Sequence, residues 1–255
     1  DAAHAVWLGE AVEAAPSVAG LTDADGRRAI DVAHPTCKQA MQAALFLLGR
    51  FDVDDGPLLH LSATAAVAAA ADRGDPEAKP VPRVALKAMR GVKQDSAELE
   101  VRAGAEQVCA ELEGRIGLDP KRVVAVKAVY ADEKAVSGAG GAEAWQLVKD
   151  AAAELGVEAE VKPGLSDFIQ AHLFKKQEVD RPSAETAGAP AKLARQPTQG
   201  TLGASNTYTY LLVMELADRS LATALMHDRI AANEWPLVRK IGADLARGLA
   251  NLHVE

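Results

Sequence analysis

The stretch PRVALKAMR, residues 82–90, carries the clearest structural pattern in the chain. Its apolar residues Val84, Leu86 and Ala88 occupy every second position, and a two-residue period is typical of a β-strand with one buried face. Lys87 lies within that alternation, so the pattern predicts a strand that carries a single lysine near its end.

A long helix is expected to follow this strand. Between Asp95 and Gly117 the apolar side chains recur every three or four residues, which places them on one helical face: Val101, Ala105, Val108, Leu112 and Ile116. Asp95 or Ser96 can cap the start of this helix, and Gly117 can end it. The valine-rich residues 122–130 then predict a second strand.

Beyond that strand the composition changes. Residues 178–206 are rich in Pro, Ala, Gly, Ser and Thr and hold almost no large apolar residue, which predicts a loop. So long a loop is uncommon inside a compact domain, so we interpret 131–206 as an insertion. Order returns with a predicted strand at 207–216, a short helix at 220–230 and a longer one at 236–253.

The first 48 residues are expected to form a separate helical segment. Asp25-Gly26 is a turn signal, and apolar residues follow it at helical spacing before Pro35. Residues 21–35 resemble the turn and first helix of one ankyrin repeat, although an ordinary turn followed by a helix fits them equally. A second helix is predicted at 37–48.

Charge and cysteine content argue against several classes of partner. The net charge is −8 and the pI about 5.3, so a broad nucleic-acid-binding surface is not expected. The two cysteines, Cys37 and Cys109, are far apart and belong to no ligand cluster, so no zinc site is expected. No apolar run is long enough to span a membrane and no signal peptide opens the chain, which together predict a cytoplasmic protein.

Three segments resemble, in the same order, parts of a eukaryotic protein kinase. VALK (84–87) resembles the lysine-bearing third strand. LLVMELADRSL (211–221) resembles the fifth strand and the hinge after it. GADLARGLANLH (242–253) resembles the end of the helix that leads to the catalytic loop. The order of the three segments carries the resemblance, because each is ordinary when taken alone.

The resemblance implies an α+β fold in which residues 49–255 form a partial kinase domain. Its protein-kinase-like small lobe would comprise 49–130 and 207–217, interrupted by the insertion, and 218–255 would begin the helical large lobe. The implied function is a fragment of a serine/threonine protein kinase that uses ATP, with Mg²⁺ in the full-length parent, and phosphorylates a protein substrate. The ankyrin-like segment in residues 1–48 would precede it.

Individual roles carry over from the kinase pattern. Lys87 would hold the α- and β-phosphates of ATP, and Glu100 on the following helix would pair with it. Glu98 and Glu106 are the alternatives to Glu100, since all three glutamates lie on that helix.

The resemblance also assigns residues to the adenine of ATP. Val67 would follow the phosphate-binding loop and Ala85 would pack on the adenine ring. Met214 would be the gatekeeper behind it, and the backbones of Glu215 and Ala217 would hydrogen-bond the adenine edge.

The sequence departs from the kinase pattern at several points. Residues 54–67 should hold a glycine-rich loop but contain only Gly56, with Ser62-Ala63-Thr64 as a small-residue substitute. Gly104 stands where kinases place a large apolar residue. The H-R-D and D-F-G motifs are absent, so this chain is expected not to transfer phosphate and to bind nucleotide weakly.

Two further interpretations remain beside the active-kinase one. A pseudokinase, or an ankyrin-linked interaction module without catalysis, fits the missing glycines. An Ala-rich α+β domain with chance matches is the third. The chain opens without Met and ends at HVE, and the predicted final helix carries an apolar stripe, so we expect more chain beyond Glu255 to cover it.

Overall fold

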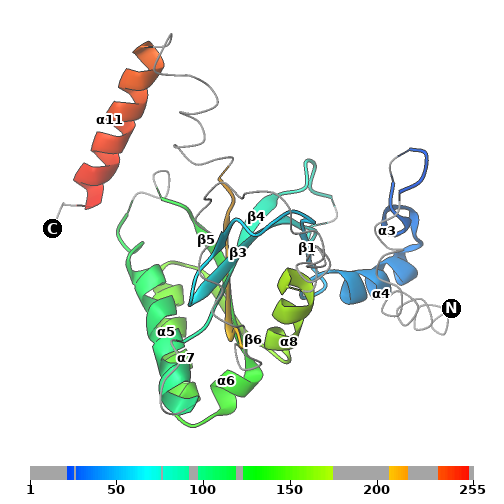
Figure 1. Ribbon diagram of the computed structural model, residues 1–255, viewed down its shortest axis with the longest axis horizontal. Helices are drawn as coiled ribbons and strands as arrows, with labels where there is room; N and C mark the ends of the chain where they lie inside the picture. Colours follow the sequence, from blue (N-terminus) through cyan, green and yellow to red (C-terminus); the bar gives the residue numbers. More distant parts are fainter. Residues whose placement is uncertain are drawn as a thin grey trace, which may run out of the picture.

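The computed structural model describes most of the chain, in seven stretches: residues 22–25, 27–75, 77–91, 97–118, 123–174, 207–217 and 235–252. Within them the fold is α+β, as predicted, with one mixed sheet and helices on both of its faces (Figure 1). The predicted loop at 178–206 and the predicted short helix at 220–230 lie outside the described residues.

The strands of the sheet are β1 (Phe51–Val53), β2 (His60–Leu61), β3 (Ala65–Asp72), β4 (Arg83–Met89), β5 (Val126–Asp132), β6 (Glu158–Lys162) and β7 (Tyr210–Glu215). They lie in the order β1-β3-β4-β7-β5-β6, and β2 pairs with β3. Neighbours are antiparallel except β5 and β6, which run parallel. The predicted strands at 82–90, 122–130 and 207–216 are confirmed as β4, β5 and β7.

The helices are α3 (Ala29–Val32), α4 (Pro35–Leu45), α5 (Ala97–Glu113), α6 (Glu133–Ser137), α7 (Gly141–Glu154), α8 (Leu165–Ile169), the π-helical turn η1 (Gln170–Phe174) and α11 (Trp235–Leu252). The predicted helices at 95–117, 37–48 and 236–253 are confirmed as α5, α4 and α11, each within a few residues of the expected bounds. None of the described helices has the length and apolar composition needed to cross a bilayer.

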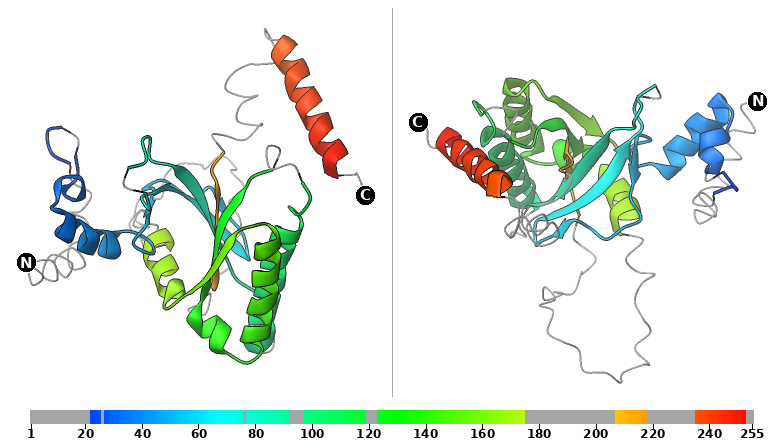
Figure 2. Two further views of the ribbon diagram at one scale, coloured as in Figure 1. Left: turned by 180° about the vertical axis from the view of Figure 1, so that it is seen from behind. Right: turned by 90° about the horizontal axis from the view of Figure 1, so that it is seen from above.

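Strand β7 lies at the centre of the sheet and is buried on both faces. Tyr210, Leu212 and Met214 belong to the core cluster shared with α5 and α7. Leu211 and Val213 belong to the cluster on the opposite face, which α8 and η1 cover. This is why 210–214 is an unbroken apolar run, and Figure 2 shows the sheet between these two layers of helices.

The alanine-rich residues 65–72 form strand β3 despite a composition that disfavours strands. β4 pairs with one edge of β3 along nearly the full length of β3. β1 and β2 pair with two parts of the other edge of β3. Alanine side chains are small, but pairing on both edges satisfies the backbone, so tertiary context decides the structure here.

Part of the predicted insertion is an ordered extension of the sheet. After β5 the chain forms α6 and α7 and then returns as β6, parallel to β5, which is a βαβ unit. Trp145 and Val148 of α7 are buried against α5 and the sheet. Residues 133–162 therefore widen the sheet at its β5 edge.

The N-terminal segment packs as a small cluster of its own. Residues 24–25 form a turn, α3 follows, and Ile30, Met41 and Phe46 bury one another. Arg28 joins this segment to the sheet, because its guanidinium pairs with Asp52 of β1 at 2.7 Å. Both interpretations of 21–35, the ankyrin-like repeat and the ordinary turn with a helix, predict a turn followed by a short helix.

Helix α11 carries the apolar stripe expected from its sequence. Val238 and Ile241 are half-buried, whereas Leu245 and Leu249 are 51% and 57% exposed. The C-terminal half of the stripe is thus open to solvent in this structure.

Candidate functional site

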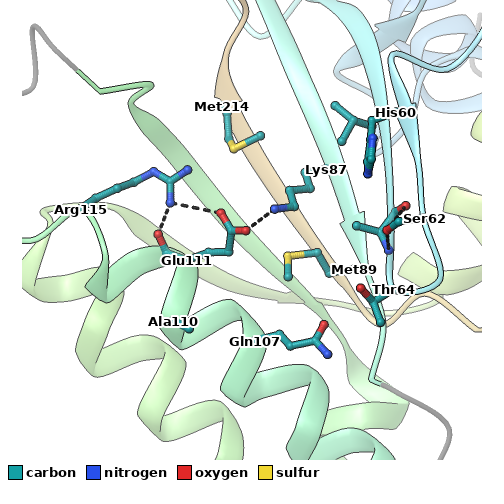
Figure 3. Close-up of a pocket in the computed structure, with 12 residues that line it drawn as sticks. His60, Ser62, Thr64, Lys87, Met89, Gln107, Ala110, Glu111, Arg115 and Met214 are labelled. Atoms are coloured by element: carbon teal, nitrogen blue, oxygen red, sulfur yellow. Dashed lines mark hydrogen bonds and ion pairs between the residues drawn. The ribbon is translucent and has the colours of Figure 1, made fainter. Parts of the chain in front are cut away.

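A cavity of about 640 Å³ opens between the β2–β3 hairpin, the sheet and helix α5 (Figure 3). Four parts of the fold meet there: residues 60–67 of the hairpin, β4, β7, and the second half of α5 with Arg115 just after it. Its lining comprises His60, Ser62, Thr64, Ala65, Val67, Lys87, Met89, Gln107, Ala110, Glu111, Arg115 and Met214. The size lies within the range of small-molecule sites.

Lys87 and Glu111 form an ion pair at the centre of this cavity. The Lys87 ammonium of β4 donates a hydrogen bond to Oε1 of Glu111, which projects from α5 (Figure 3). The two side chains are 18% and 30% exposed. The other carboxylate oxygen, Oε2, lies 3.2 Å from Nη1 of Arg115, so one carboxylate is shared by two cations.

The electrostatics of the pair favour an ionised carboxylate. Burial alone would raise the pKa of Glu111, but the hydrogen bond and charge of Lys87, helped by Arg115, outweigh it and hold that pKa below its ordinary value. At neutral pH the cluster therefore has two positive charges and one negative charge. A net positive cavity is chemically suited to an anion.

In this structure Lys87 is paired with Glu111 and not with Glu100, the partner expected from the sequence. The alternative Glu106 instead pairs with Arg102 on the outer surface of α5, at 3.1 Å. The side chain of Glu98 lies outside the described residues. Glu100 and Glu111 share one face of the helix, separated by about three turns.

The close packing of two glycines explains why Glu111, about three turns further along α5 than Glu100, reaches Lys87. A Cβ on Gly91 would lie 1.8 Å from the carbonyl oxygen of Glu100, and one on Gly104 would lie 3.0 Å from the Gly91 nitrogen. The first turns of α5 are thus held against the end of β4. From there the helix runs back along the strand, and seven residues of about 1.5 Å each bring it from Gly104 to Glu111, near Lys87.

The same contact explains why a glycine occupies position 104. A Cβ at this position would also approach the Tyr210 ring to 3.1 Å. A large apolar side chain has no room here, so the glycine is required by this packing.

The β2–β3 hairpin covers the cavity where a glycine-rich loop would lie. Its turn is closed by a hydrogen bond from the Ser62 amide to the Ala65 carbonyl (2.8 Å) and one from the Ala65 amide to the Ser62 hydroxyl (3.1 Å). These two amides are occupied within the turn. The groups that the hairpin presents to the cavity are side chains, among them His60, Ser62 and Thr64.

Arg90 ties this hairpin to the end of β4. Its amide donates to the Thr64 carbonyl (3.0 Å) and its Nε to the Ala63 carbonyl (2.7 Å), while its guanidinium lies 5.5 Å from the centroid of the Tyr208 ring. The hairpin tip is therefore anchored through its carbonyl groups.

The structure brings only some of the predicted site residues to the cavity. Lys87, Val67 and Met214 line it. Ala85 is buried and pairs with Met214 across β4 and β7, but it is not among the lining residues. Glu215 and Ala217 are exposed beyond the lining, and the Glu215 amide already donates to the Ala125 carbonyl at 2.9 Å.

Glu111, Arg115, Gln107 and His60 are site residues that the sequence interpretation missed. One signal was available: Glu111 and Arg115 are four residues apart, a spacing at which opposite charges on a helix attract. Arg102 and Glu106 have the same spacing, however, so the signal alone does not identify the pair that faces the cavity.

The chain was compared with family models, curated proteins and solved structures, and none of them matched it. Its function is therefore inferred from the geometry of the site.

Proposed function

We propose that the cavity binds ATP and that the chain carries the ATP-binding small lobe of a protein-kinase-like domain. One observation carries the proposal: a strand lysine, Lys87, is paired with a glutamate of the very next helix, Glu111. In protein kinases a lysine on the third strand and a glutamate on the following helix form such a pair, and the lysine holds the nucleotide phosphates.

The arrangement of the strands supports the same proposal. β4 and β7 are the strands that resemble the third and fifth strands of kinases, and they are direct neighbours in the sheet. Their register places Ala85 opposite Met214, the two residues assigned to the adenine pocket by the resemblance. Helix α5 lies between β4 and β5 in sequence, as the corresponding kinase helix does.

The chemistry of the lining suits a nucleotide. Val67, Met89 and Met214 give the cavity an apolar wall, and Lys87 and Arg115 supply positive charge for phosphate groups. No group of three or more His, Cys, Asp or Glu side chains among the described residues is placed to hold a metal ion. We therefore propose that this chain contacts ATP through its own cations.

Binding should be weak, because the hairpin offers no free glycine amides to the phosphates. A Kd of about 0.1–1 mM corresponds to only about 4–5.5 kcal/mol of binding free energy. Phosphoryl transfer by a serine/threonine kinase containing this small lobe is part of the proposal. The residues given hold no H-R-D or D-F-G motif to perform it.

The hairpin favours one alternative, a pseudokinase or interaction module. The Ser62 and Ala65 amides are occupied within the turn, and Arg90 anchors its tip. A hairpin held in this way is a poor phosphate cradle. In this second candidate function the Lys87–Glu111 pair would serve to stabilise the fold.

Nucleotide titration of matched lysine variants separates the two candidates. Lys127 is a suitable control, since it is an exposed lysine on β5 of the same sheet and is not part of the cavity. We expect Lys87→Ala to weaken ATP binding at least about tenfold, the value of one charge-assisted hydrogen bond, and Lys127→Ala to leave it unchanged. Equal affinity in the wild type and Lys87→Ala would rule out ATP binding at this cavity.

A further inference from the structure

Arg115 makes more contacts than an ordinary helix-end arginine. Its Nη1 lies 3.2 Å from the carboxylate of Glu111 and also donates to the backbone carbonyl of the same residue. Its Nε donates to the carbonyl of Val124 at 3.2 Å. One guanidinium thus joins the end of α5 and the pocket carboxylate (Figure 3) to the segment that leads into β5.

The two oxygens of Glu111 are divided between two cations. Oε1 accepts from Lys87 and Oε2 from Arg115, so the carboxylate plane is fixed from both sides. The Arg115 and Glu111 side chains are 21% and 30% exposed. A half-buried carboxylate that accepts several hydrogen bonds keeps little rotamer freedom. A glutamate side chain without such bonds would lose considerable conformational entropy on becoming ordered.

The same helix provides a contrast. Arg102 and Glu106 are also four residues apart and also form an ion pair, but their side chains are 68% and 60% exposed. Exposed pairs of this kind contribute little to stability and fix no geometry. The difference between the two pairs is burial and the additional bonds of Arg115.

We propose that Arg115 is a positioning residue: it holds Glu111 against Lys87 in the ligand-free chain, so that the Lys87 ammonium is already aimed into the cavity when a phosphate arrives. This inference rests on the proposed ATP site. Affinity gained in this way comes from preorganisation, because the ordering of Glu111 is complete before binding.

Arg115 also lines the cavity, so a second role must be distinguished by experiment. It could contact a phosphate itself, independently of Glu111. The two roles make different predictions for a double variant. If Arg115 acts through Glu111, its removal has no further effect once the carboxylate is gone; if it contacts phosphate, the two losses add.

The experiment measures two quantities on the full chain. The first is the affinity for the fluorescent analogue trinitrophenyl-ATP, in wild type, Arg115→Ala, Arg115→Lys, Glu111→Gln and the double variant Glu111→Gln/Arg115→Ala. The second is the Glu111 carboxyl titration followed by ¹³C NMR, in wild type, Lys87→Ala, Arg115→Ala and their double variant. Arg102→Ala is the matched control in both.

We expect Arg115→Ala to weaken binding about fivefold, the upper value for a partly exposed ion pair, and Arg115→Lys to restore part of it. In the Glu111→Gln background the same change should have no effect. Lys87→Ala should raise the Glu111 pKa. This rise should be smaller in the Arg115→Ala background, because without Arg115 the Lys87 ammonium no longer contacts the carboxylate. Arg102→Ala should change neither quantity.

Additive losses of affinity in the double variant would overturn the inference in favour of a direct phosphate contact. Additive shifts in the Glu111 pKa would overturn it as well, since they would show that Arg115 does not order the Lys87 pair. If the wild type binds no nucleotide, the proposed function fails, and the Glu111 titration by itself still decides whether Arg115 positions the carboxylate.

Discussion

At the scale of single residues, the buried tyrosine of the central strand makes the clearest pH prediction. Tyr210 is fully buried in the core beside α5, and burial raises its pKa to about 12. Its hydroxyl has no hydrogen-bond partner among the described residues. The folded chain therefore holds the phenolic proton more tightly than the unfolded chain does.

This raised pKa makes stability depend on pH in a defined window. The contribution is fully present below the unfolded pKa of about 10 and is lost as pH rises towards 12, by about 2–3 kcal/mol in all. Tyr210→Phe should remove this loss and leave the neutral-pH stability equal or higher, because it deletes an unpaired buried hydroxyl. Urea unfolding of both proteins from pH 8 to 12 tests it, and parallel pH profiles would contradict it.

Among the site residues, Lys87 could be predicted from sequence but its partner could not. VALK is a local pattern, so it identifies the lysine without knowledge of the fold. Several glutamates lie on α5, and which one meets Lys87 depends on where the helix starts relative to β4. That position is set by the contact of Gly91 with Gly104, which no local pattern reveals.

At the scale of elements, the Gly91 contact makes a stability prediction. Gly91→Ala would place a Cβ 1.8 Å from the Glu100 carbonyl oxygen, so either β4 or α5 must move. We expect a loss of about 3 kcal/mol in the free energy of unfolding, as for other overpacked sites. Gly56→Ala is the matched control, because no atom lies within 4 Å of its added Cβ. Equal stability of the two variants in urea would contradict the packing described here.

The β2–β3 hairpin provides a second prediction for an element. Arg90→Ala removes the hydrogen bond to Ala63 and the contact with Tyr208, and so frees the hairpin tip. We expect the Ser62 and Ala65 amides to exchange with deuterium about fivefold faster, which corresponds to about 1 kcal/mol of local stability. Removing the exposed ion pair of Arg83 with Asp54 by Arg83→Ala should leave both rates unchanged. Unchanged exchange in Arg90→Ala would show that Arg90 does not anchor the tip.

The elements themselves were predictable to different degrees. α5 and β4 carry strong local periodicity and β7 is a short unbroken apolar run, so the sequence indicates each of them within a few residues. β3 was harder, since its alanines have low strand propensity and only its pairing on both edges makes it a strand. The parallel return of β6 beside β5 depends on contacts between distant residues, and periodicity carries no information about those.

At the scale of the whole molecule, the described residues that flank 175–206 lie side by side. The rings of Phe174 and Tyr208 stack with centroids 5.1 Å apart and an angle of 16° between their planes. Phe174 and Tyr208, on the two sides of this segment, therefore meet at one place in the fold. The part of the predicted insertion before Phe174 extends the sheet, and 178–206, by composition, is expected to add little apolar burial.

Shortening this segment should leave the fold intact. We expect replacement of 175–206 by a Gly/Ser linker of about eight residues to preserve cooperative unfolding and raise stability by about 1 kcal/mol, because a shorter loop costs less closure entropy. Circular dichroism during urea unfolding measures both. A loss of cooperativity, or a fall in stability, would show that 175–206 contributes to the core.

Covalent labelling can show whether ATP binds beside Lys87, as proposed. An acyl-phosphate derivative of ATP places a reactive carbonyl next to the phosphates, and a nearby lysine amine attacks that carbonyl, forming an amide and releasing ATP. Mass spectrometry of the labelled chain identifies the modified lysine. We predict labelling at Lys87 that excess ATP suppresses, with the exposed Lys127 labelled slowly and without competition. If Lys87 is labelled no faster than Lys127, or if excess ATP does not suppress its labelling, ATP does not bind beside Lys87.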